Sequence, residues 1–424
     1  MHIAIPYGEQ ELTATFDWGR CIDTLDIADT PPIADPAKIL AQALCNPIGQ
    51  STTIQDDVQP GESIAIIVSD SFRHTGVEQL LPTLIDTLLG SGVIEADIFF
   101  VFSTGSHRGP TPEEAQRILG SDIYTRFKNR AYSHDPNDTD NLVELGTTSA
   151  GTPVFINRRV VEADRVICTG AVVFHYFGGF GGGRKSIVPG VAGLETIAHN
   201  HARNLDPNED TLNPAVQIGA LTGNPVAEDM LEGTKFCEVD LLINTVLNRN
   251  GEIAGIFCGD LIAAHESACA FARDQYAVTI TEQADLVIAS AGKAKNFIQS
   301  HKALFNAWQA LKPGGVIIFI APAPEGYGGN KFVQWLELGT RENIISELRK
   351  NAEINGQTAL STLEKAKQAI LVTEMDTAQV EALGAVKASS LEEALAIART
   401  RLDNDTATWY LMPSAAYTVP FLTS

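Results

Sequence analysis

Three stretches of this chain repeat one local pattern, in which an apolar run is followed by a polar loop and then by a helical period. The apolar runs are Ile64–Ser69, Asp97–Ser103 and Asp164–Thr169. Short continuous apolar runs are typical of strands that are buried on both faces of a parallel sheet. Repeated strand–loop–helix units predict a mostly parallel sheet with right-handed crossovers, so we expect an α/β fold.

Local signals mark where several other elements begin. Asp35, followed by a proline, predicts the cap of a short helix over 37–44. A capping box starts at Thr111, also with proline at the first helical position, and a further helix is expected over Leu194–Arg203. The pair Asn250-Gly251 predicts a hairpin with a type I′ turn between two strands.

The chain is long enough for more than one domain. Its 424 residues suit two or three domains, with two favoured. A second α/β pattern starts with the strand Asp285–Ser290 and continues with the helix Gln299–Leu311, which Pro313 is expected to stop. We therefore expect two domains, 1–275 and 276–424, each with a mostly parallel sheet flanked by helices. The last segment is expected to pack back on the N-terminal domain.

Composition excludes several classes of protein. A formal net charge of −22 repels nucleic acids and anionic membranes at long range, so neither is expected as a partner. No apolar run is long enough to span a bilayer, and the N-terminal sequence lacks the basic and apolar regions of a signal peptide. The six cysteines are scattered without CxxC spacing, which argues against a thiolate zinc site and a disulfide framework. We expect a cytoplasmic protein.

The loop after the third strand is rich in glycine. His175–Lys185 reads HYFGGFGGGRK, and its five glycines allow the backbone to approach a ligand closely. It is not the GxxxxGK(S/T) loop, because Arg184 precedes the lysine, and it does not fit GxGxxG in register. A nucleotide loop of either common kind is therefore disfavoured. Two interpretations stay open, the seat of a phosphate- or metal-bearing cofactor and a flexible loop with incidental histidines.

Polar side chains gather at the predicted ends of the strands. Because the carboxyl ends of parallel strands meet at one sheet edge, where ligands bind, we expect six residues to converge there: Asp70, Arg73, His107, Arg108, His175 and Lys185. Two histidines that face one substrate suit proton removal and return, and arginines suit a carboxylate or phosphate. Taken alone, each residue is also compatible with loop capping or a solvated position.

Two pairs of residues on predicted helices bear on the site in different ways. Gln299 and Lys302 are three residues apart and share one helix face. His199 and His201 are two residues apart and do not share a face, so at most one of them points into a site. Either histidine is also compatible with an ordinary structural hydrogen bond.

A set of motifs carries a resemblance to a known family. The motifs are Asp70-x-x-Arg73-x-Thr75, Thr104-Gly105-Ser106-His107-Arg108, His175 with Gly178–Lys185, Pro189-Gly190, His201, and Gln299-x-x-Lys302. In these motifs and in their spacing, the chain resembles the nickel-pincer lactate racemase family, the 2-hydroxyacid racemases and epimerases. The resemblance covers nearly the whole chain.

The resemblance implies a cofactor and a role for each residue. The cofactor is the nickel-pincer nucleotide, a pyridinium-3,5-bisthiocarboxylic acid mononucleotide that a thioamide tethers to Lys185, with nickel held by one carbon and two sulfurs of the cofactor and by His201. The residues that match the acid/base pair are His107 and His175. Those that match the substrate-binding residues are Arg73, Gln299 and Lys302. The cofactor-binding set also includes Asp70, Thr75, Gly105, Arg108, Gly181 and Gly182, with Asp70 at the ribose.

The implied reaction racemises a small anionic 2-hydroxyacid in a cleft between the domains. One histidine removes the hydroxyl proton while the α-hydrogen leaves as a hydride to the pyridinium ring, and the planar keto acid accepts the hydride again on its other face. The implied partners are the substrate and the enzymes that make the cofactor, and the protein is expected as a monomer or homodimer. Two alternatives stay open: a cofactor-binding protein without turnover, and a conventional NAD-type dehydrogenase.

Several positions depart from the pattern of the family. Ile298 stands where lactate racemases usually carry tyrosine, and Gly76 stands where proline is common. The run upstream, 289–294, reads ASAGKA and not the expected Gly-Gly-x-Pro-Lys-Asp type. These positions are expected near the substrate and not near the cofactor. We therefore expect a different or broader 2-hydroxyacid substrate than lactate alone.

Overall fold

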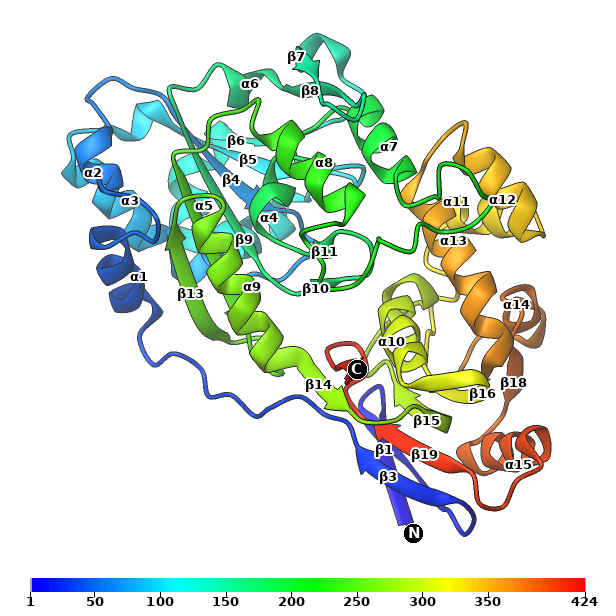
Figure 1. Ribbon diagram of the computed structural model, residues 1–424. Coiled ribbons are helices and arrows are strands. Elements are labelled where there is room, and N and C mark those ends of the chain that lie inside the picture. The colour runs from blue at the N-terminus through cyan, green and yellow to red at the C-terminus, as the bar shows by residue number, and fades with distance from the viewer. Residues whose placement is uncertain (1, 424) are drawn as a thin grey trace. The chain divides into compact units, whose positions relative to one another are not determined.

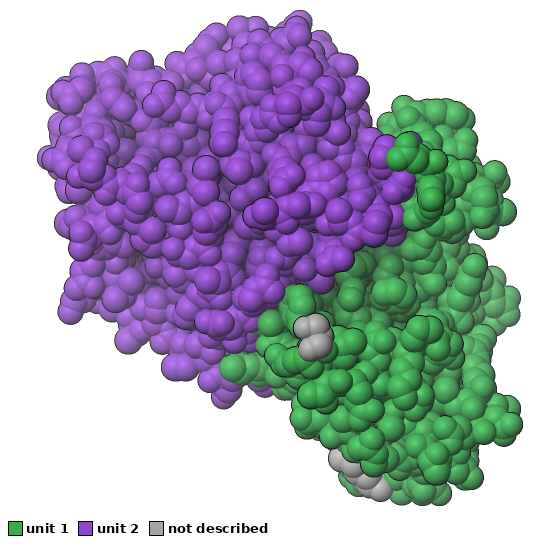
Figure 2. Space-filling model, viewed as in Figure 1, with its two compact units in different colours: residues 1–28, 208–211, 276–424 green, residues 29–207, 212–275 purple. Residues whose placement is uncertain are grey.

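Two six-stranded sheets organise the chain, one in each of two units, which Figure 2 colours separately. The computed structural model describes residues 2–423. Unit 1 comprises residues 1–28, 208–211 and 276–424, and unit 2 comprises residues 29–207 and 212–275. Both sheets are mostly parallel and flanked by helices, so the predicted α/β class is confirmed (Figure 1).

The sheet of unit 2 has the strand order β13-β12-β9-β4-β5-β6. All neighbours are parallel except β13, which runs antiparallel to β12. Every residue of β4 is buried, as its apolar run predicts. The strands are β4 (Ile64–Ser69), β5 (Ile98–Ser103), β6 (Ala131–Ser133), β9 (Arg165–Ala171), β12 (Leu241–Leu247) and β13 (Ile253–Gly259), with small two-stranded ladders formed by β7 (Leu142–Thr147) and β8 (Pro153–Asn157) and by β10 (Phe174–His175) and β11 (Gly179–Phe180).

Helices cover both faces of this sheet. Leu84 and Leu88 pack with Phe100 of β5 and Phe127 in one buried cluster on one face. Figure 1 shows α1 and α3 on one side of the sheet and α8 and α9 on the other. The helices of this part of the chain are α1 (Pro36–Cys45), α2 (Ile54–Asp57), α3 (Leu81–Gly90), α4 (Pro112–Leu119), α5 (Ser121–Phe127), α6 (Arg158–Val161), α7 (Leu194–Ala202), α8 (Pro225–Thr234) and α9 (Ala263–Tyr276).

The path of the chain reverses across this sheet next to β4. From β4 the chain moves to β5 and β6 on one side, and from β9 it moves to β12 on the other side. The carboxyl ends of β4 and β9 therefore flank the topological switch point, where open α/β sheets bind ligands. The loops after β4, β5 and β9 carry most of the residues predicted for the site.

The sheet of unit 1 has the strand order β18-β17-β16-β15-β19-β3, and all its neighbours are parallel. Its strands are β3 (Arg20–Thr24), β15 (Ala284–Ser290), β16 (Leu311–Ile320), β17 (Ala369–Val372), β18 (Val386–Ala388) and β19 (Thr408–Met412). Its helices are α10 (Phe297–Gln309), α11 (Asn330–Leu336), α12 (Arg341–Leu348), α13 (Ile354–Lys365), α14 (Thr377–Ala382) and α15 (Leu391–Leu402). The switch point of this sheet lies between β15 and β19, and α10 follows β15.

The two ends of the chain both belong to unit 1. The change to unit 1 at Tyr276 lies next to the division predicted at 275, whereas residues 1–28 group with the C-terminal part. There β1 (His2–Tyr7) and β2 (Gln10–Thr15) form an antiparallel hairpin, and β3 pairs with β19. At the other end, β20 (Val419–Leu422) pairs in parallel with β14 (Ala277–Ile280). The last segment is thus part of unit 1, together with the first 28 residues.

Local predictions were met to different degrees. The caps at Asp35 and Thr111 are confirmed, the second as a full capping box. The hairpin of β12 and β13 forms, but a type I′ turn is wrong, because Gly251 has a positive φ and Asn250 does not. The side chain of Asn248 accepts from the backbone N–H groups of Asn250 and Glu252, so it shapes a longer loop.

The predicted stop of α10 at Pro313 is also wrong. The helix ends at Gln309, and Pro313 lies within β16 at a register shift against β15. Among residues 2–423, none of the helices is both long and apolar enough to cross a bilayer.

Candidate active site

The loop after β4 and the loop after β5 meet through a carboxylate–imidazole pair. Asp70 directly follows β4 and is 1% exposed, and its Oδ2 lies 2.7 Å from Nδ1 of His107. Its Oδ1 accepts from the backbone N–H of Phe72, so Asp70 also caps its own turn. A carboxylate accepts hydrogen bonds, so Nδ1 of His107 carries the proton and Nε2 is left as the basic nitrogen.

The other cations of these loops differ in what they contact. Arg108 makes two hydrogen bonds with Glu114 at 2.6 and 2.8 Å, which hold the pKa of Glu114 at about 2 and raise the pKa of Arg108. Its guanidinium also lies 5.4 Å from the ring of Phe72. Arg73 is exposed, and Thr75 is buried with its carbonyl bonded to the hydroxyl of Thr245. Arg108 is therefore engaged within its own loop, whereas Arg73 is accessible to solvent.

The glycine loop joins the same edge of the sheet. The N–H of Gly105, two residues before His107, donates to the carbonyl of Gly190 at 2.9 Å. Within the loop, His175 is 7% exposed, and its Nδ1 accepts from the N–H groups of Phe177 (3.4 Å) and Gly178 (3.2 Å). In the neutral ring the proton of His175 is therefore on Nε2, the opposite arrangement from His107.

The ring of Phe177 is the common neighbour of three predicted site residues. Its centroid lies 4.4 Å from that of His175, 4.9 Å from that of His201 and 5.3 Å from Nζ of Lys185. The last two come from different elements, since Lys185 lies at the end of the glycine loop and His201 on α7. The predicted loop and helix are thus brought together around one aromatic side chain, which the sequence analysis did not single out.

His201 is held as a neutral imidazole. It is 4% exposed, and burial, followed by the charge of Lys185, lowers its pKa to about 3. The neutral form is the one that binds metal ions. His199 is exposed, so one of the two histidines faces the interior, in agreement with their helical spacing.

Two buried polar side chains that the sequence analysis missed hold the glycine loop. Asn244 of β12 accepts from the N–H of Gly183 at 3.0 Å, and Nε2 of His265 on α9 lies 2.9 Å from the carbonyl of Gly181. Gly183 has a φ of +52°, and a Cβ there would lie 2.4 Å from Cγ of His265. The polar Asn244 within the apolar run LLINTVL is the signal that could have revealed this support.

The remaining predicted residues lie on unit 1. Gln299 and Lys302 are exposed on the first turns of α10, which Asn296 caps by accepting from the N–H of Gln299 at 3.0 Å. The side-chain oxygen of Gln299 accepts from the N–H of Lys295. Lys293 is paired with Glu9 at 2.8 Å. Lys302 lies on the same exposed face of α10 as Gln299, as predicted.

Comparison with known proteins places the chain among relatives. The lactate racemase N-terminal domain family matches residues 7–212, and the lactate racemase C-terminal domain family matches residues 279–415. The lactate racemase of Thermoanaerobacterium thermosaccharolyticum is 31% identical over 418 residues, which cover 95% of this chain and 96% of that protein. This chain belongs to the lactate racemase family. The lactate racemase of Lactiplantibacillus plantarum is 31% identical over 335 residues, 78% of this chain and 77% of that protein.

Solved structures agree with this membership of the lactate racemase family. The lactate racemase apoprotein from T. thermosaccharolyticum superposes with a TM-score of 0.88 at 29% identity, covering 99% of this chain and 100% of that one. A structural genomics structure from Thermotoga maritima shares the fold, with a TM-score of 0.64 at 16% identity, covering 94% of this chain and 100% of that one. The predicted family and the predicted class of enzyme, an isomerase, are confirmed.

The residues fit the nickel-bearing cofactor that the sequence implies for the lactate racemase family. Among residues 2–423, no group of three or more His, Cys, Asp or Glu side chains could hold a metal ion. The primary amine of Lys185 and the buried neutral imidazole of His201 both neighbour Phe177, so a group that could anchor the cofactor and a group that could bind its metal lie next to the same ring.

Proposed function

We propose that this protein is a nickel-dependent racemase or epimerase of a small 2-hydroxyacid, lactate or a related 2-hydroxycarboxylate. The proposal assigns it the nickel-pincer nucleotide, joined covalently to Lys185 and with nickel bound by His201. The observation that carries it is the neutral, buried His201 next to Lys185 around Phe177, in a chain whose relatives are named lactate racemases.

The cofactor supplies the part of the chemistry that side chains lack. When bound, the nickel-pincer nucleotide takes up the α-hydrogen of the substrate as a hydride and returns it. Gly181 and Gly182 precede the attachment residue in the loop, and the carbonyl of Gly182 accepts from the N–H of Lys185 at 3.1 Å. The proposal also assigns Thr75 and Gly105, on the loops after β4 and β5, to cofactor binding. In our proposal Asp70 acts through His107, with which it shares a hydrogen bond, instead of holding the ribose.

The two histidines handle the hydroxyl proton. His107 presents a basic Nε2, because Asp70 holds the proton on Nδ1, so it accepts the proton of a substrate hydroxyl. His175 presents an Nε2–H, because its Nδ1 accepts two backbone N–H groups, so it donates a hydrogen bond to the same oxygen. The reverse roles, needed for the other enantiomer, require Nδ1 of His175 to release those N–H groups.

Cationic side chains bind the carboxylate of the substrate. Arg73 on unit 2 and Lys302 on unit 1 are both exposed, and Gln299 offers an amide N–H on the same helix face as Lys302. Ile298 lies beside Gln299 in the first turn of α10, and its N–H bonds to the carbonyl of Tyr327. An aliphatic side chain at this position favours a broader or different 2-hydroxyacid over lactate alone.

The decisive experiment measures the cofactor directly. The chain is co-expressed with the cofactor-making enzymes and purified, and its intact mass and nickel content are determined. We expect an added mass on Lys185 and one nickel per chain, both absent from Lys185→Ala. A wild-type chain with an unmodified Lys185 and no nickel would refute the proposal.

Turnover separates an enzyme from a protein that only carries the cofactor. The loaded protein is incubated with single enantiomers of several 2-hydroxyacids, and the product is analysed by chiral chromatography. His107→Ala and His175→Ala are expected to abolish turnover and keep the adduct on Lys185. Retained racemisation in either variant would contradict the acid/base assignment, and oxidation that consumes NAD would indicate a dehydrogenase.

A further inference from the structure

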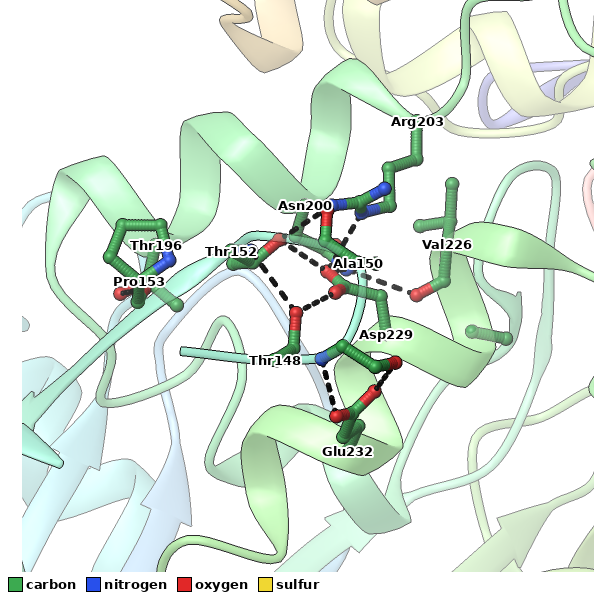
Figure 3. Close-up of polar contacts among 12 residues, drawn as sticks. Thr148, Ala150, Thr152, Pro153, Thr196, Asn200, Arg203, Val226, Asp229 and Glu232 are labelled. Atoms are coloured by element: carbon green, nitrogen blue, oxygen red, sulfur yellow. Dashed lines mark hydrogen bonds and ion pairs between the residues drawn. The ribbon is translucent and has the colours of Figure 1, made fainter. Parts of the chain in front are cut away.

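A buried carboxylate outside the proposed site gathers polar side chains from two other segments of the chain. Asp229 of α8 is 5% exposed. Figure 3 shows its neighbours, and the separations from its carboxylate oxygens are 2.7 Å for Thr148 Oγ1, 2.9 Å for Thr152 Oγ1, 2.9 Å for Asn200 Nδ2 and 3.2 Å for Arg203 Nε. The 148–152 turn, α7 and α8 thus meet at a single charge.

Two of these neighbours flank the proposed nickel ligand in the sequence. Asn200 precedes His201, is fully buried and also donates to the carbonyl of Val226 at 3.0 Å. Arg203 follows His201 by two residues, and its Nη2 donates to Thr152 Oγ1 at 3.1 Å and to the carbonyl of Ala150. His201 lies in the last turn of α7, where helices fray, so its position depends on what anchors that turn.

The polar anchors form a stripe along the helix. Thr196, one turn earlier, donates to the carbonyl of Pro153 at 2.7 Å and accepts from the N–H of Phe155 at 2.9 Å (Figure 3 shows the first contact). Residues 196, 200 and 203 are spaced i, i+4 and i+7, so they share one face. A stripe of this spacing normally packs through apolar side chains.

The hydrogen bonds of residues 196, 200 and 203 fix the position of α7 more than they stabilise the folded protein. The side-chain nitrogen of Asn200 donates to two acceptors. Its side-chain oxygen Oδ1 is buried and has no hydrogen-bond partner among residues 2–423. An unpaired buried oxygen lowers stability, and an apolar residue of similar size avoids that penalty. An apolar seam, however, permits small rotations and shifts of the helix, which hydrogen bonds prevent.

We propose that Asp229, with Thr148, Thr152, Asn200 and Arg203, is the positioning group for the nickel ligand His201. The network fixes the rotation and the axial position of the last turn of α7, so that the imidazole stays next to Phe177 and Lys185. The inference rests on the proposed function, because it assigns His201 to nickel. It adds five positioning residues to that site.

The test uses substitutions that remove hydrogen bonds without changing shape. Thr148→Val removes the hydroxyl that donates to Asp229, Thr148→Ser keeps it, and Asp229→Asn removes the charge. Thr362→Val is the matched control, because Thr362 is a fully buried threonine of unit 1 whose hydroxyl donates to a carbonyl at 2.8 Å. Two quantities are measured: hydrogen–deuterium exchange over residues 194–203 of the cofactor-free chain, and the rate at which the loaded protein releases nickel to a chelator.

We expect faster exchange over residues 194–203 in Thr148→Val and Asp229→Asn, with α3 unchanged. Nickel release is expected to be about 10- to 100-fold faster in both variants, as for lost outer-shell partners of a metal ligand, while the adduct mass on Lys185 stays. Thr148→Ser and Thr362→Val are expected to behave as wild type in both measurements.

Each of the two measurements can overturn the inference by itself. Unchanged exchange of α7 in Asp229→Asn would show that the network does not hold the helix, a result that needs no cofactor. Two results of the nickel measurement would show that the network does not act on His201. One is a wild-type rate of nickel release from Thr148→Val although its α7 exchanges faster. The other is nickel release from Thr148→Ser as fast as from Thr148→Val. A wild-type chain that takes up no nickel at all overturns the proposed function, whereas a difference among variants of a loaded chain concerns the network alone.

Discussion

Oδ2 of Asp70 lies 2.7 Å from Nδ1 of His107, and this contact joins the ends of two adjacent parallel strands. It gives His107 a defined tautomer with Nε2 free of a proton. His175 has the opposite tautomer, because backbone N–H groups occupy its Nδ1. The two histidines of the proposed pair are therefore not equivalent before substrate binds.

Asp70→Asn is predicted to impair His107 as a base. An amide nitrogen facing Nδ1 favours the tautomer with the proton on Nε2, which then cannot accept the hydroxyl proton. We expect kcat to fall by about 10²- to 10⁴-fold, with the adduct on Lys185 intact. Initial rates with each enantiomer check this, and Asp138→Asn, an exposed carboxylate of the same unit, is the control. A kcat within twofold of wild type would contradict the role of Asp70.

Gly183→Ala is predicted to displace the glycine loop. The new methyl group would lie 2.4 Å from the His265 ring in a backbone conformation with φ of +52°. We expect a loss of at least about 3 kcal/mol in the free energy of unfolding and a weakened attachment of cofactor to Lys185. Urea unfolding and intact mass measure both.

Gly223→Ala separates the backbone effect from the clash. Gly223 has a φ of +75°, and a Cβ there would meet no atom within 4 Å. It is expected to cost only about 1–2 kcal/mol and to load normally. Equal losses in the two variants would mean that the His265 contact has no effect.

His265 is predicted to make the stability of unit 2 depend on pH. Burial, with a smaller effect of Arg184, lowers its pKa from 6.5 to about 4. The unfolded chain binds a proton below pH 6.5 that the folded chain does not, so stability is complete above pH 6.5 and is lost as the pH falls towards 4. In this window the residue contributes a slope of about 1.4 kcal/mol per pH unit to the free energy of unfolding.

The measurement is urea unfolding at several values between pH 7 and pH 5. His265→Gln is expected to flatten the dependence by that slope, because its amide does not titrate. His199→Gln, at an exposed histidine of the same unit, is expected to keep the wild-type dependence. The prediction would be disproved if the free energy of unfolding changed with pH by the same slope in His265→Gln and in wild type.

Lys302→Ala is predicted to weaken substrate binding more than it slows turnover. Loss of a charged partner for the substrate carboxylate is expected to raise KM by about 10- to 100-fold. Lys295→Ala removes an exposed lysine from the loop before the same helix and is expected to leave KM unchanged. Steady-state kinetics of the loaded enzyme test this, and an equal effect of both variants would point to general electrostatics in place of a specific contact.

Much of the fold followed from local patterns. Ile64–Ser69 was predicted with correct ends, because a strand buried on both faces must be apolar throughout and its neighbours are polar. The carboxyl ends of β4, β5 and β9 then brought the predicted loops together, since parallel strands share one edge. β3 was not foreseen as part of the C-terminal sheet, because its partner β19 lies at the far end of the chain and RCIDT has no buried pattern.

The supports of the candidate site could not be read from local patterns. His265 and Asn244 hold the glycine loop from elements that follow it in the chain, and Asp229 gathers partners from two other segments. A hydrogen bond between distant segments leaves no periodicity in either one. The only local sign of such a hydrogen bond in the sequence is a polar residue inside an apolar run, such as Asn244.

The pairing of β3 with β19 sets an order for biosynthesis. The ribosome delivers residues 20–24 first, but the strand that they pair with is residues 408–412. Unit 2, which ends at residue 275, is complete in sequence long before unit 1. Since domains fold as they emerge, the polypeptide from 29 to 275 can acquire its structure while residues 20–24 still lack the strand that they pair with.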